Sequence, residues 1–231
     1  MVISSVFIAL STFLAKGVAG RFDFLGETGI HPVQITAGRF IAAWLIWVVV
    51  VLVRRTTLTH IHWPLHIVRT VFGWLTVTCV FWAGSLMALA DATAISFLTP
   101  VVTLVLAAIF LGEKVGWVRK SAVAIMLCGA LLLLRPGTSA YQPAALIALL
   151  AALTSGFESL FIKKITRLEP IIQILFVNNS IGVVLALFVA IWFWVWPTPA
   201  QWVFMGFVGI AMATAQVFFL VSMRDGDASF V

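Results

Sequence analysis

Charged side chains are scarce in this sequence. Asp, Glu, Lys and Arg make up 10% of its 231 residues, whereas hydrophobic residues make up 63%. A soluble domain has about a quarter charged residues and about half apolar ones. A soluble globule could not bury so much apolar surface, whereas lipid accepts it. The composition therefore excludes an ordinary soluble domain and predicts an integral membrane protein.

Cysteine is almost absent. The two cysteines, Cys79 and Cys128, both fall inside hydrophobic stretches, so a disulfide framework is not expected. Neither has a neighbour of metal-binding type. A cleavable signal peptide is not expected either, because the first apolar stretch starts almost at Met1 and lacks a charged leader and a small-residue cleavage site.

Motifs that carry catalysis are missing as well. The sequence has no Gly-x-x-x-x-Gly-Lys-Ser/Thr loop for nucleotide phosphates, no His-Glu-x-x-His pair and no serine nucleophile elbow. The spacing of His60, His62 and His66 could suit a metal, but Pro64 interrupts a helical arrangement and no acidic residue lies nearby in sequence. We therefore predict no enzymatic activity, no catalytic residue, no metal site and no cofactor.

The basic residues are scattered along the chain. The formal net charge is +6, but lysine and arginine fall in short clusters between apolar stretches, so nucleic-acid binding is not expected. Such clusters are typical of cytoplasmic loops in membrane proteins. With a cytoplasmic N-terminus, ten of these residues lie inside: Arg54, Arg55, Arg69, Lys114, Arg119, Lys120, Lys163, Lys164, Arg167 and Arg224. Lys16, Arg21 and Arg135 then lie outside, and Arg39 lies within a span, so this orientation is predicted.

Eight hydrophobic stretches approach the roughly 20 apolar residues that a spanning helix needs. They cover residues 2–17, 32–53, 67–90, 92–111, 119–135, 143–162, 170–196 and 200–222. A ninth begins at about Ala228 and has almost no length. The loop after the seventh stretch is surrounded by Trp192, Trp194, Trp196 and Trp202, which predicts an aromatic belt at the outer interface. We predict an all-α bundle of eight transmembrane helices plus the stub of a ninth.

Small residues recur every four positions in two of these stretches. Ala148, Ala152 and Gly156 do so in the sixth, and Gly209 and Ala213 in the eighth. Small side chains allow helix backbones to approach closely where lipid provides no hydrophobic drive. We predict close helix packing at these positions.

Proline marks most span ends, but Pro100 lies within the fourth span. A proline there frees a backbone carbonyl and should kink the helix. Two interpretations stay open. Either the kink helps to line a substrate site, or Ser96 or Thr99 satisfies the freed carbonyl and the proline is merely tolerated.

Two distant segments resemble each other. Residues 88–97 read ALADATAISF and residues 222–231 read SMRDGDASFV, and each opens a hydrophobic stretch. In a chain of membrane spans, such a match indicates a duplicated unit. The second copy is short, so we expect part of the second unit to be missing.

The segment 91–113 carries a mid-span proline and ends in Leu-Gly-Glu. It resembles the EamA-type branch of the drug/metabolite transporter superfamily, as does the following span that ends at 129–137. Four further features fit the family pattern: Lys16 at the end of the first span, Arg39 in the second, Lys163 as the counterpart of Lys16, and residues 224–229 as the entry to a ninth helix.

The resemblance implies ten helices in two five-helix repeats of opposite orientation. Residues 1–137 would form the first EamA repeat, and residues 138–231 an incomplete second repeat with three helices and the start of a fourth. It also implies secondary-active import or export of a small organic metabolite by alternating access. The alternatives are a non-transporting truncated fragment of such a carrier and, more remotely, a membrane-embedded enzyme.

Two charged side chains lie within predicted spans. Arg39 lies in the outer half of the second span, where an unpaired charge costs several kcal/mol. It either attracts an anionic substrate group, such as a carboxylate, or forms a structural pair or carbonyl clamp between helices. Glu158 is either a proton-coupling group or an interfacial carboxylate that reaches the headgroups beside Lys163 and Lys164.

Uncharged side chains complete the candidate site. The amides of Asn178 and Gln216 either join helices or hydrogen-bond to substrate, and the aromatic residues of the third span either stack on substrate or pack against neighbouring helices. The candidate substrate-binding residues are Arg39, Trp74, Phe81, Trp82, Ser96, Thr99, Asn178 and Gln216, with Glu158 as the coupling candidate and Pro100 as the kink.

The expected environment follows from these patterns. We predict a multi-pass protein of a bacterial cytoplasmic (inner) membrane whose partners are the lipid bilayer and a small-molecule substrate. The sequence leaves open a homodimer.

Overall fold

The computed structural model of the chain describes residues 2–21, 29–87, 91, 95, 98–110, 116–134 and 144–225. Over these residues the regular structure is entirely helical. Lipid supplies no hydrogen-bonding partner, so a helix, which satisfies its own backbone, is the structure that apolar sequence should adopt there. The helices are α1 (Val2–Lys16), the π-helix η1 (Gly17–Arg21), α2 (Pro32–Arg54), α3 (Trp63–Leu86), α5 (Thr99–Phe110), α6 (Trp117–Leu134), α7 (Ala144–Ile165), α8 (Ile171–Ala190), the 3-10 helix η3 (Ile191–Phe193) and α9 (Pro199–Asp225).

Five helices in the described part are long and apolar enough to cross a membrane. They cover Pro32–Arg54, Trp63–Leu86, Ala144–Ile165, Ile171–Phe193 and Pro199–Arg224. The predictions of an all-α fold and an integral membrane protein are therefore confirmed. Helices α1, α5 and α6 coincide with three other expected spans but have shorter apolar stretches. The count of eight spans plus a ninth stays a prediction, and the stub at Ala228 lies outside the described residues.

Helix α3 begins four residues before the predicted third span, at Trp63. Pro64 lies in its first turn, where the missing N–H costs little. His66 and Arg69 therefore lie inside the helix, and both are buried. The sequence-based placement of Arg69 in a cytoplasmic loop is wrong, although the predicted span of residues 67–90 already included this position.

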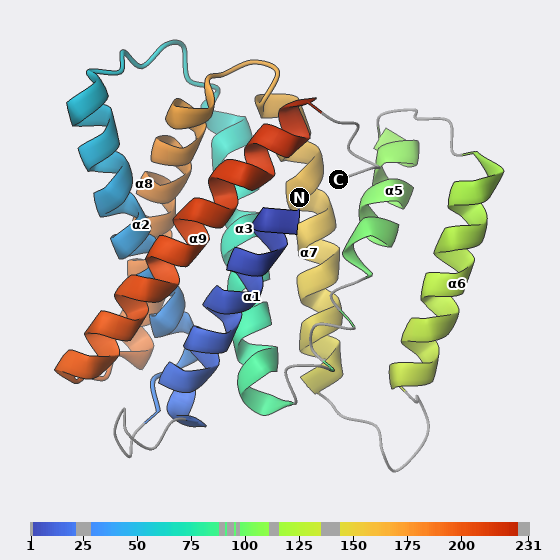
Figure 1. The fold of residues 1–231 in the computed structure, drawn as a ribbon, viewed down its shortest axis with the longest axis horizontal. Helices are drawn as coiled ribbons and strands as arrows, with labels where there is room; N and C mark the ends of the chain where they lie inside the picture. Colours follow the sequence, from blue (N-terminus) through green and yellow to red (C-terminus); the bar gives the residue numbers. More distant parts are fainter. Residues whose placement is uncertain are drawn as a thin grey trace.

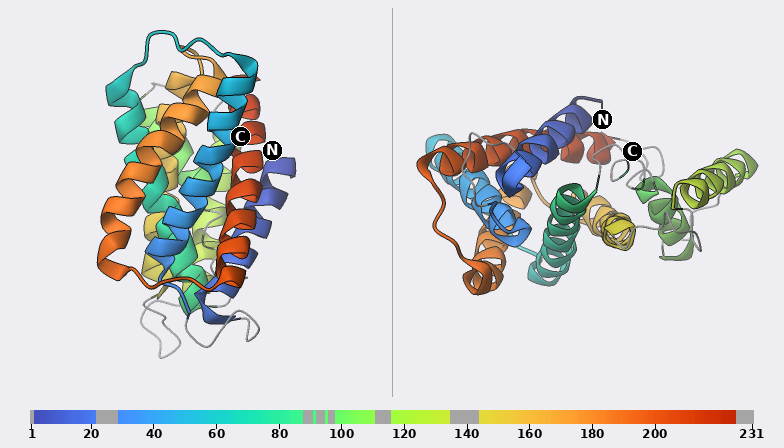
Figure 2. Two further views of the ribbon diagram at one scale, coloured as in Figure 1. Left: turned by 90° about the vertical axis from the view of Figure 1, so that its left-hand side faces the viewer. Right: turned by 90° about the horizontal axis from the view of Figure 1, so that it is seen from below.

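The helices pack in pairs that join distant parts of the chain. α3 runs along α7, α1 along α9 and α2 along α8, while α9 also packs on α2 and α5 on α7. Figure 1 shows α2, α8 and α9 on one side of the bundle and α5 and α6 on the other. Seen from below (Figure 2, right), the helices form an elongated row with α6 at its end.

Small residues lie where helices approach most closely, as predicted. A Cβ on Gly156 would lie 2.4 Å from Val102 Cγ1 on α5, and one on Gly209 would lie 2.4 Å from Ala42 Cβ on α2. Ala148 and Ala152 are buried in the apolar cluster that joins α7 to α5. These contacts confirm that the small-residue pattern serves helix packing.

The two ends of the bundle differ in charge. At one end, α2, α7 and α9 finish and α3 and α8 begin (top of Figure 1). We call it the basic end, because it carries Arg54, Arg55, Lys163, Lys164, Arg167 and Arg224. At the opposite end the ring of Trp194 lies 6.1 Å from Trp196 and 6.4 Å from Trp202, between ring centroids. A cytoplasmic basic end agrees with this distribution and stays a prediction.

Candidate functional site

Two arginines lie inside the helix bundle. Arg39 comes from the half of α2 away from the basic end and Arg69 from the basic-end half of α3, and each is only 1% exposed. Within the described part of the chain, Nε and Nη1 of both guanidiniums are buried without a hydrogen-bond partner. Arg39 Cζ lies 3.9 Å from the centroid of the Phe40 ring, a cation–π contact. Buried donors of this kind are costly to leave unpaired, so they mark a place for a ligand or water.

Glu158, on α7, supplies a negative charge near both arginines. The carboxylate attracts Arg39 and Arg69 electrostatically, yet among the described residues no ion pair within 4.0 Å joins it to either one. Its side chain is half-buried and lies against Gly73 of α3. A Cβ on Gly73 would lie 2.6 Å from Glu158 Oε1, so glycine makes room for the carboxylate. The three charges are close enough to interact and are not locked into contact.

The amide side chains line neighbouring helices. Asn178 on α8 accepts a hydrogen bond at Oδ1 from Thr70 Oγ1 on α3, 3.0 Å away. Asn179 donates from Nδ2 to Gln216 Oε1 on α9 at 3.2 Å and to the Leu175 carbonyl at 2.8 Å. The Asn179 Oδ1 atom is buried with no partner among the described residues. These contacts join α3, α8 and α9 and leave one acceptor for a further partner.

The three aromatic candidates of α3 lie in different surroundings. Trp74 packs against a cluster that contains Phe40, and its Nε1 is buried without a described partner. Phe81 is buried with apolar residues of α1, α2 and α9. Trp82 is 40% exposed and makes an edge contact with His31 at 5.8 Å between ring centroids. Trp74 is thus grouped with the Arg39 region, whereas Phe81 and Trp82 lie elsewhere on the helix.

The described candidates of the fourth span lie on α5. Thr99 and Pro100 begin α5, which packs on α7, and the Thr99 carbonyl accepts a bond from Thr103 Oγ1 at 2.9 Å. Pro100 is therefore a first-turn residue of α5 rather than an interior one. Ser96 lies outside the described residues, as do most of residues 88–97, the Leu-Gly-Glu at 111–113 and residues 226–231.

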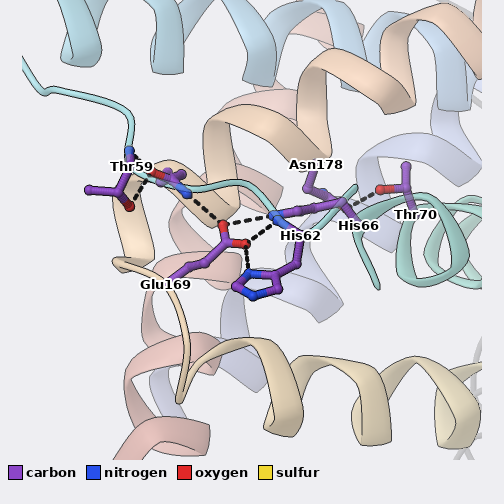
Figure 3. A network of polar contacts seen from close by, with 7 residues as sticks. Thr59, His62, His66, Thr70, Glu169 and Asn178 are labelled. Carbon is purple, nitrogen blue, oxygen red and sulfur yellow. Dashed lines mark hydrogen bonds and ion pairs between the residues drawn. The ribbon is translucent and has the colours of Figure 1, made fainter. Parts of the chain in front are cut away.

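A second polar network lies at the basic end (Figure 3). Glu169, in the turn between α7 and α8, accepts hydrogen bonds from the His62 backbone N–H at 2.8 Å, His62 Nδ1 at 2.9 Å and His66 Nε2 at 2.9 Å. Gln173 Nε2 also donates to it at 2.7 Å, and Gln173 Oε1 accepts from the Thr59 N–H at 2.7 Å. These hydrogen bonds connect the α2–α3 loop to the α7–α8 turn.

The hydrogen bonds determine the ionisation of Glu169. Burial by itself would raise the pKa of this carboxyl, but the donors of His62, His66 and Gln173 outweigh burial and lower the pKa to about 2. The group is therefore ionised at neutral pH. Sequence reasoning missed this partner of the histidines because Glu169 is more than a hundred residues away in the chain. Within the described residues no set of ligands suited to a metal ion is found.

Two lysines bind backbone carbonyls at opposite ends of the bundle. Lys16 Nζ, at the end of α1, donates to the carbonyl of Met87, which caps α3, at 3.0 Å. Lys163 Nζ, near the end of α7, donates to the Met223 carbonyl in the last turns of α9 at 3.3 Å. Both lysines thus bind the final carbonyls of another helix, where cations are favoured.

Similarity to known proteins identifies the family. The profile of the EamA-like transporter family matches residues 1–135. The chain belongs to this family. The predicted resemblance to EamA-type transporters is therefore confirmed, and the membrane and transport assignments with it.

Relatives of this EamA protein are named as transporters. It is 26% identical over 207 residues to an S-adenosylmethionine uptake transporter of Rickettsia felis, a match that covers 89% of this chain and 70% of the relative. It is 26% identical over 171 residues to the pseudopaline exporter CntI of Pseudomonas aeruginosa, covering 73% and 60%. It is 33% identical over 181 residues to a riboflavin transporter of Rhizobium johnstonii, covering 75% and 57%.

A solved crystal structure is similar in fold. It has a TM-score of 0.66 at 21% identity and covers 98% of this chain and 80% of its own. The family and the named relatives are transporters rather than enzymes, which fits the prediction that this EamA protein is not an enzyme.

Proposed function

We propose that this chain is a secondary-active transporter of a small organic metabolite, working by alternating access in a bacterial cytoplasmic membrane with its N-terminus in the cytoplasm. The observation that carries the proposal is the charge cluster of Arg39, Arg69 and Glu158 within apolar helices. Intramembrane charges are expensive and are typical of substrate or ion paths. A structural clamp would hold each guanidinium in contact with a carboxylate or carbonyl, and among the described residues neither has such a contact.

We also propose that residues 1–137 and 138–231 are two inverted EamA repeats, the second incomplete. The helix pairs support this, because α1 packs along α9 as α7 packs along α3. If one repeat is superposed on the other, α1 corresponds to α7 and α3 corresponds to α9. The α1–α9 pair therefore corresponds to the α7–α3 pair. The carbonyl contacts of Lys16 and Lys163 correspond in the same way, because Lys16 joins α1 to the end of α3 and Lys163 joins α7 to the end of α9, at opposite ends of the bundle. Inverted repeats that rock around a central site are a common basis of alternating access.

The names of the relatives support a small metabolite without specifying one. They cover S-adenosylmethionine uptake, pseudopaline export and riboflavin transport. Both directions of movement occur among them, so import and export are equally compatible with the proposal.

The first test is the variant Arg39→Gln. If Arg39 binds substrate, uptake into proteoliposomes should fall about tenfold or more, because a charge-assisted hydrogen bond is lost. The amount of folded protein in the membrane should stay at the wild-type level. The matched control is Arg54→Gln, which removes an exposed arginine from the end of the same helix and should leave uptake unchanged. Equal losses of uptake and of folded protein would indicate a structural role for Arg39.

A second test addresses the driving force. We propose that Glu158, the carboxylate that interacts electrostatically with both arginines, exchanges the coupled proton. An imposed pH gradient should accelerate uptake by the wild type, and Glu158→Gln should abolish that acceleration while leaving downhill exchange in place. If Glu158→Gln responds to the gradient as the wild type does, the coupling role is wrong.

A further inference from the structure

The net charge of the central cluster points to the charge of its ligand. Arg39 and Arg69 contribute two positive charges, and Glu158 contributes one negative charge. The described interiors of α2, α3, α7, α8 and α9 hold no other Lys, Arg, Asp or Glu, since the remaining ones lie at helix ends. With Glu158 ionised, these three side chains therefore carry one uncompensated positive charge, which is unfavourable in a medium of low dielectric constant.

We propose that the transported substrate is an organic monoanion whose carboxylate binds at the cluster of Arg39, Arg69 and Glu158. The inference rests on the proposed transport function and names its substrate class. One carboxylate brings the cluster to zero net charge and offers acceptors to the unpaired Nε and Nη1 donors of both guanidiniums. Guanidinium groups match planar carboxylates in geometry as well as charge.

Other charge classes fit less well. A zwitterion or a neutral molecule leaves the positive charge in place, and a cation adds to it. A phosphate monoester carries about −1.5 to −2 at neutral pH and overcompensates. While Glu158 is ionised, it limits the ligand to a single negative charge.

The scaffold around the arginines supports this assignment. Phe40 lies under the Arg39 guanidinium and packs in one cluster with Trp74, whose Nε1 donor has no partner among the described residues. Gly73 lets the Glu158 carboxylate lie beside α3, one turn from Arg69. An aromatic carboxylate is therefore a suitable probe.

The experiment compares probes that share a benzene ring and differ in charge. Benzoate, benzamide, benzamidine, phenyl phosphate and phthalate are titrated by calorimetry into the full chain in phosphatidylcholine nanodiscs. Benzoate should bind at least about tenfold more tightly than each of the others. Benzamide and benzamidine lack a negative charge for the charge-assisted bonds, and phenyl phosphate and phthalate carry more than one. Equal binding of benzoate and benzamide, or no binding of benzoate, overturns the proposal.

The decisive variant is Glu158→Gln, which raises the cluster to two uncompensated positive charges. Its ratio of phthalate to benzoate affinity should rise about tenfold or more over that of the wild type, a shift that a structural role would not produce. Arg69→Gln should abolish the preference for benzoate over benzamide, whereas Arg54→Gln should keep it. If an arginine variant fails to fold, the Glu158→Gln ratio still decides, and an unchanged ratio contradicts the assignment.

Uptake assays distinguish a failure of this inference from a failure of the proposed transport function. Proteoliposomes are given radiolabelled monocarboxylates, zwitterionic amino acids, amines and neutral sugars in parallel. Accumulation of monocarboxylates alone supports both proposals. Accumulation of another class keeps the transport function and overturns the substrate class. If nothing accumulates, the transport function fails, and the calorimetric ratios alone judge the anion site.

Discussion

Replacing Glu169 with Gln should lower the stability of the folded protein by about 3 kcal/mol at neutral pH. The buried carboxylate accepts four hydrogen bonds, and the amide of Gln would face two of those donors with a donor of its own. The lowered pKa of about 2, against an ordinary value of 4.5, corresponds to a stabilisation of this order. Thermal unfolding followed by tryptophan fluorescence should show a melting temperature lower by roughly 5–10 °C.

The pH dependence of this loss has a definite sign. The pKa of Glu169 is lower in the folded state than in the unfolded state, so its contribution is complete above about pH 4.5 and is lost as pH falls toward 2. The stability difference between the wild type and Glu169→Gln should be about 3 kcal/mol at pH 7 and about half of that at pH 3. Arg167→Gln is the control, because Arg167 is an exposed charge in the same turn. A melting temperature of Glu169→Gln equal to that of Arg167→Gln would refute the role of the network.

The basic-end network shows what could not be predicted from sequence. Three histidines within seven positions have a spacing that could suit a metal, although no metal site was predicted, and the structure gives two of them a hydrogen-bonded carboxylate. Their partner follows α3, α5, α6 and α7 in chain order, and only the packing of α3 against α7 and α8 brings it near. Pairings at such sequence distances leave no local pattern.

Arg69 illustrates a different limit. The all-α membrane fold follows from apolar stretches of spanning length, because lipid permits few alternatives. Helix starts are harder to place, since the first two turns of α3 contain Pro64, His66 and Arg69. Arg69 lay at the very start of the predicted span 67–90 and was counted with the cytoplasmic residues, whereas Arg39, surrounded by apolar residues, was visible as an intramembrane charge. The aromatic candidates Phe81 and Trp82 share a helix with Trp74 but not its surroundings, because rotation of a helix about its axis is set by its neighbours.

The small-residue pattern, by contrast, could be predicted directly from sequence, and disrupting it should lower the stability of the folded protein. Replacing Gly209 with Leu should prevent α9 from packing on α2. A Cβ at Gly209 would lie 2.4 Å from Ala42 Cβ and 2.9 Å from the Arg39 carbonyl oxygen. The second of these atoms belongs to the backbone and cannot turn aside, so the helices must separate. Overpacking of this kind typically costs about 1–3 kcal/mol, and more where backbone must move.

Gly206 provides the matched control for this substitution, because it lies on the same helix and a Cβ there would meet nothing within 4 Å. Gly206→Leu should leave the melting temperature unchanged or raise it slightly, since glycine is a weak helix former. Gly209→Leu should lower it by several degrees and should also weaken substrate binding, because Arg39 lies at the same crossing. Gly209→Ala should fall between the two. If both leucine variants melt alike, the close approach of α2 and α9 is not what stabilises this half of the bundle.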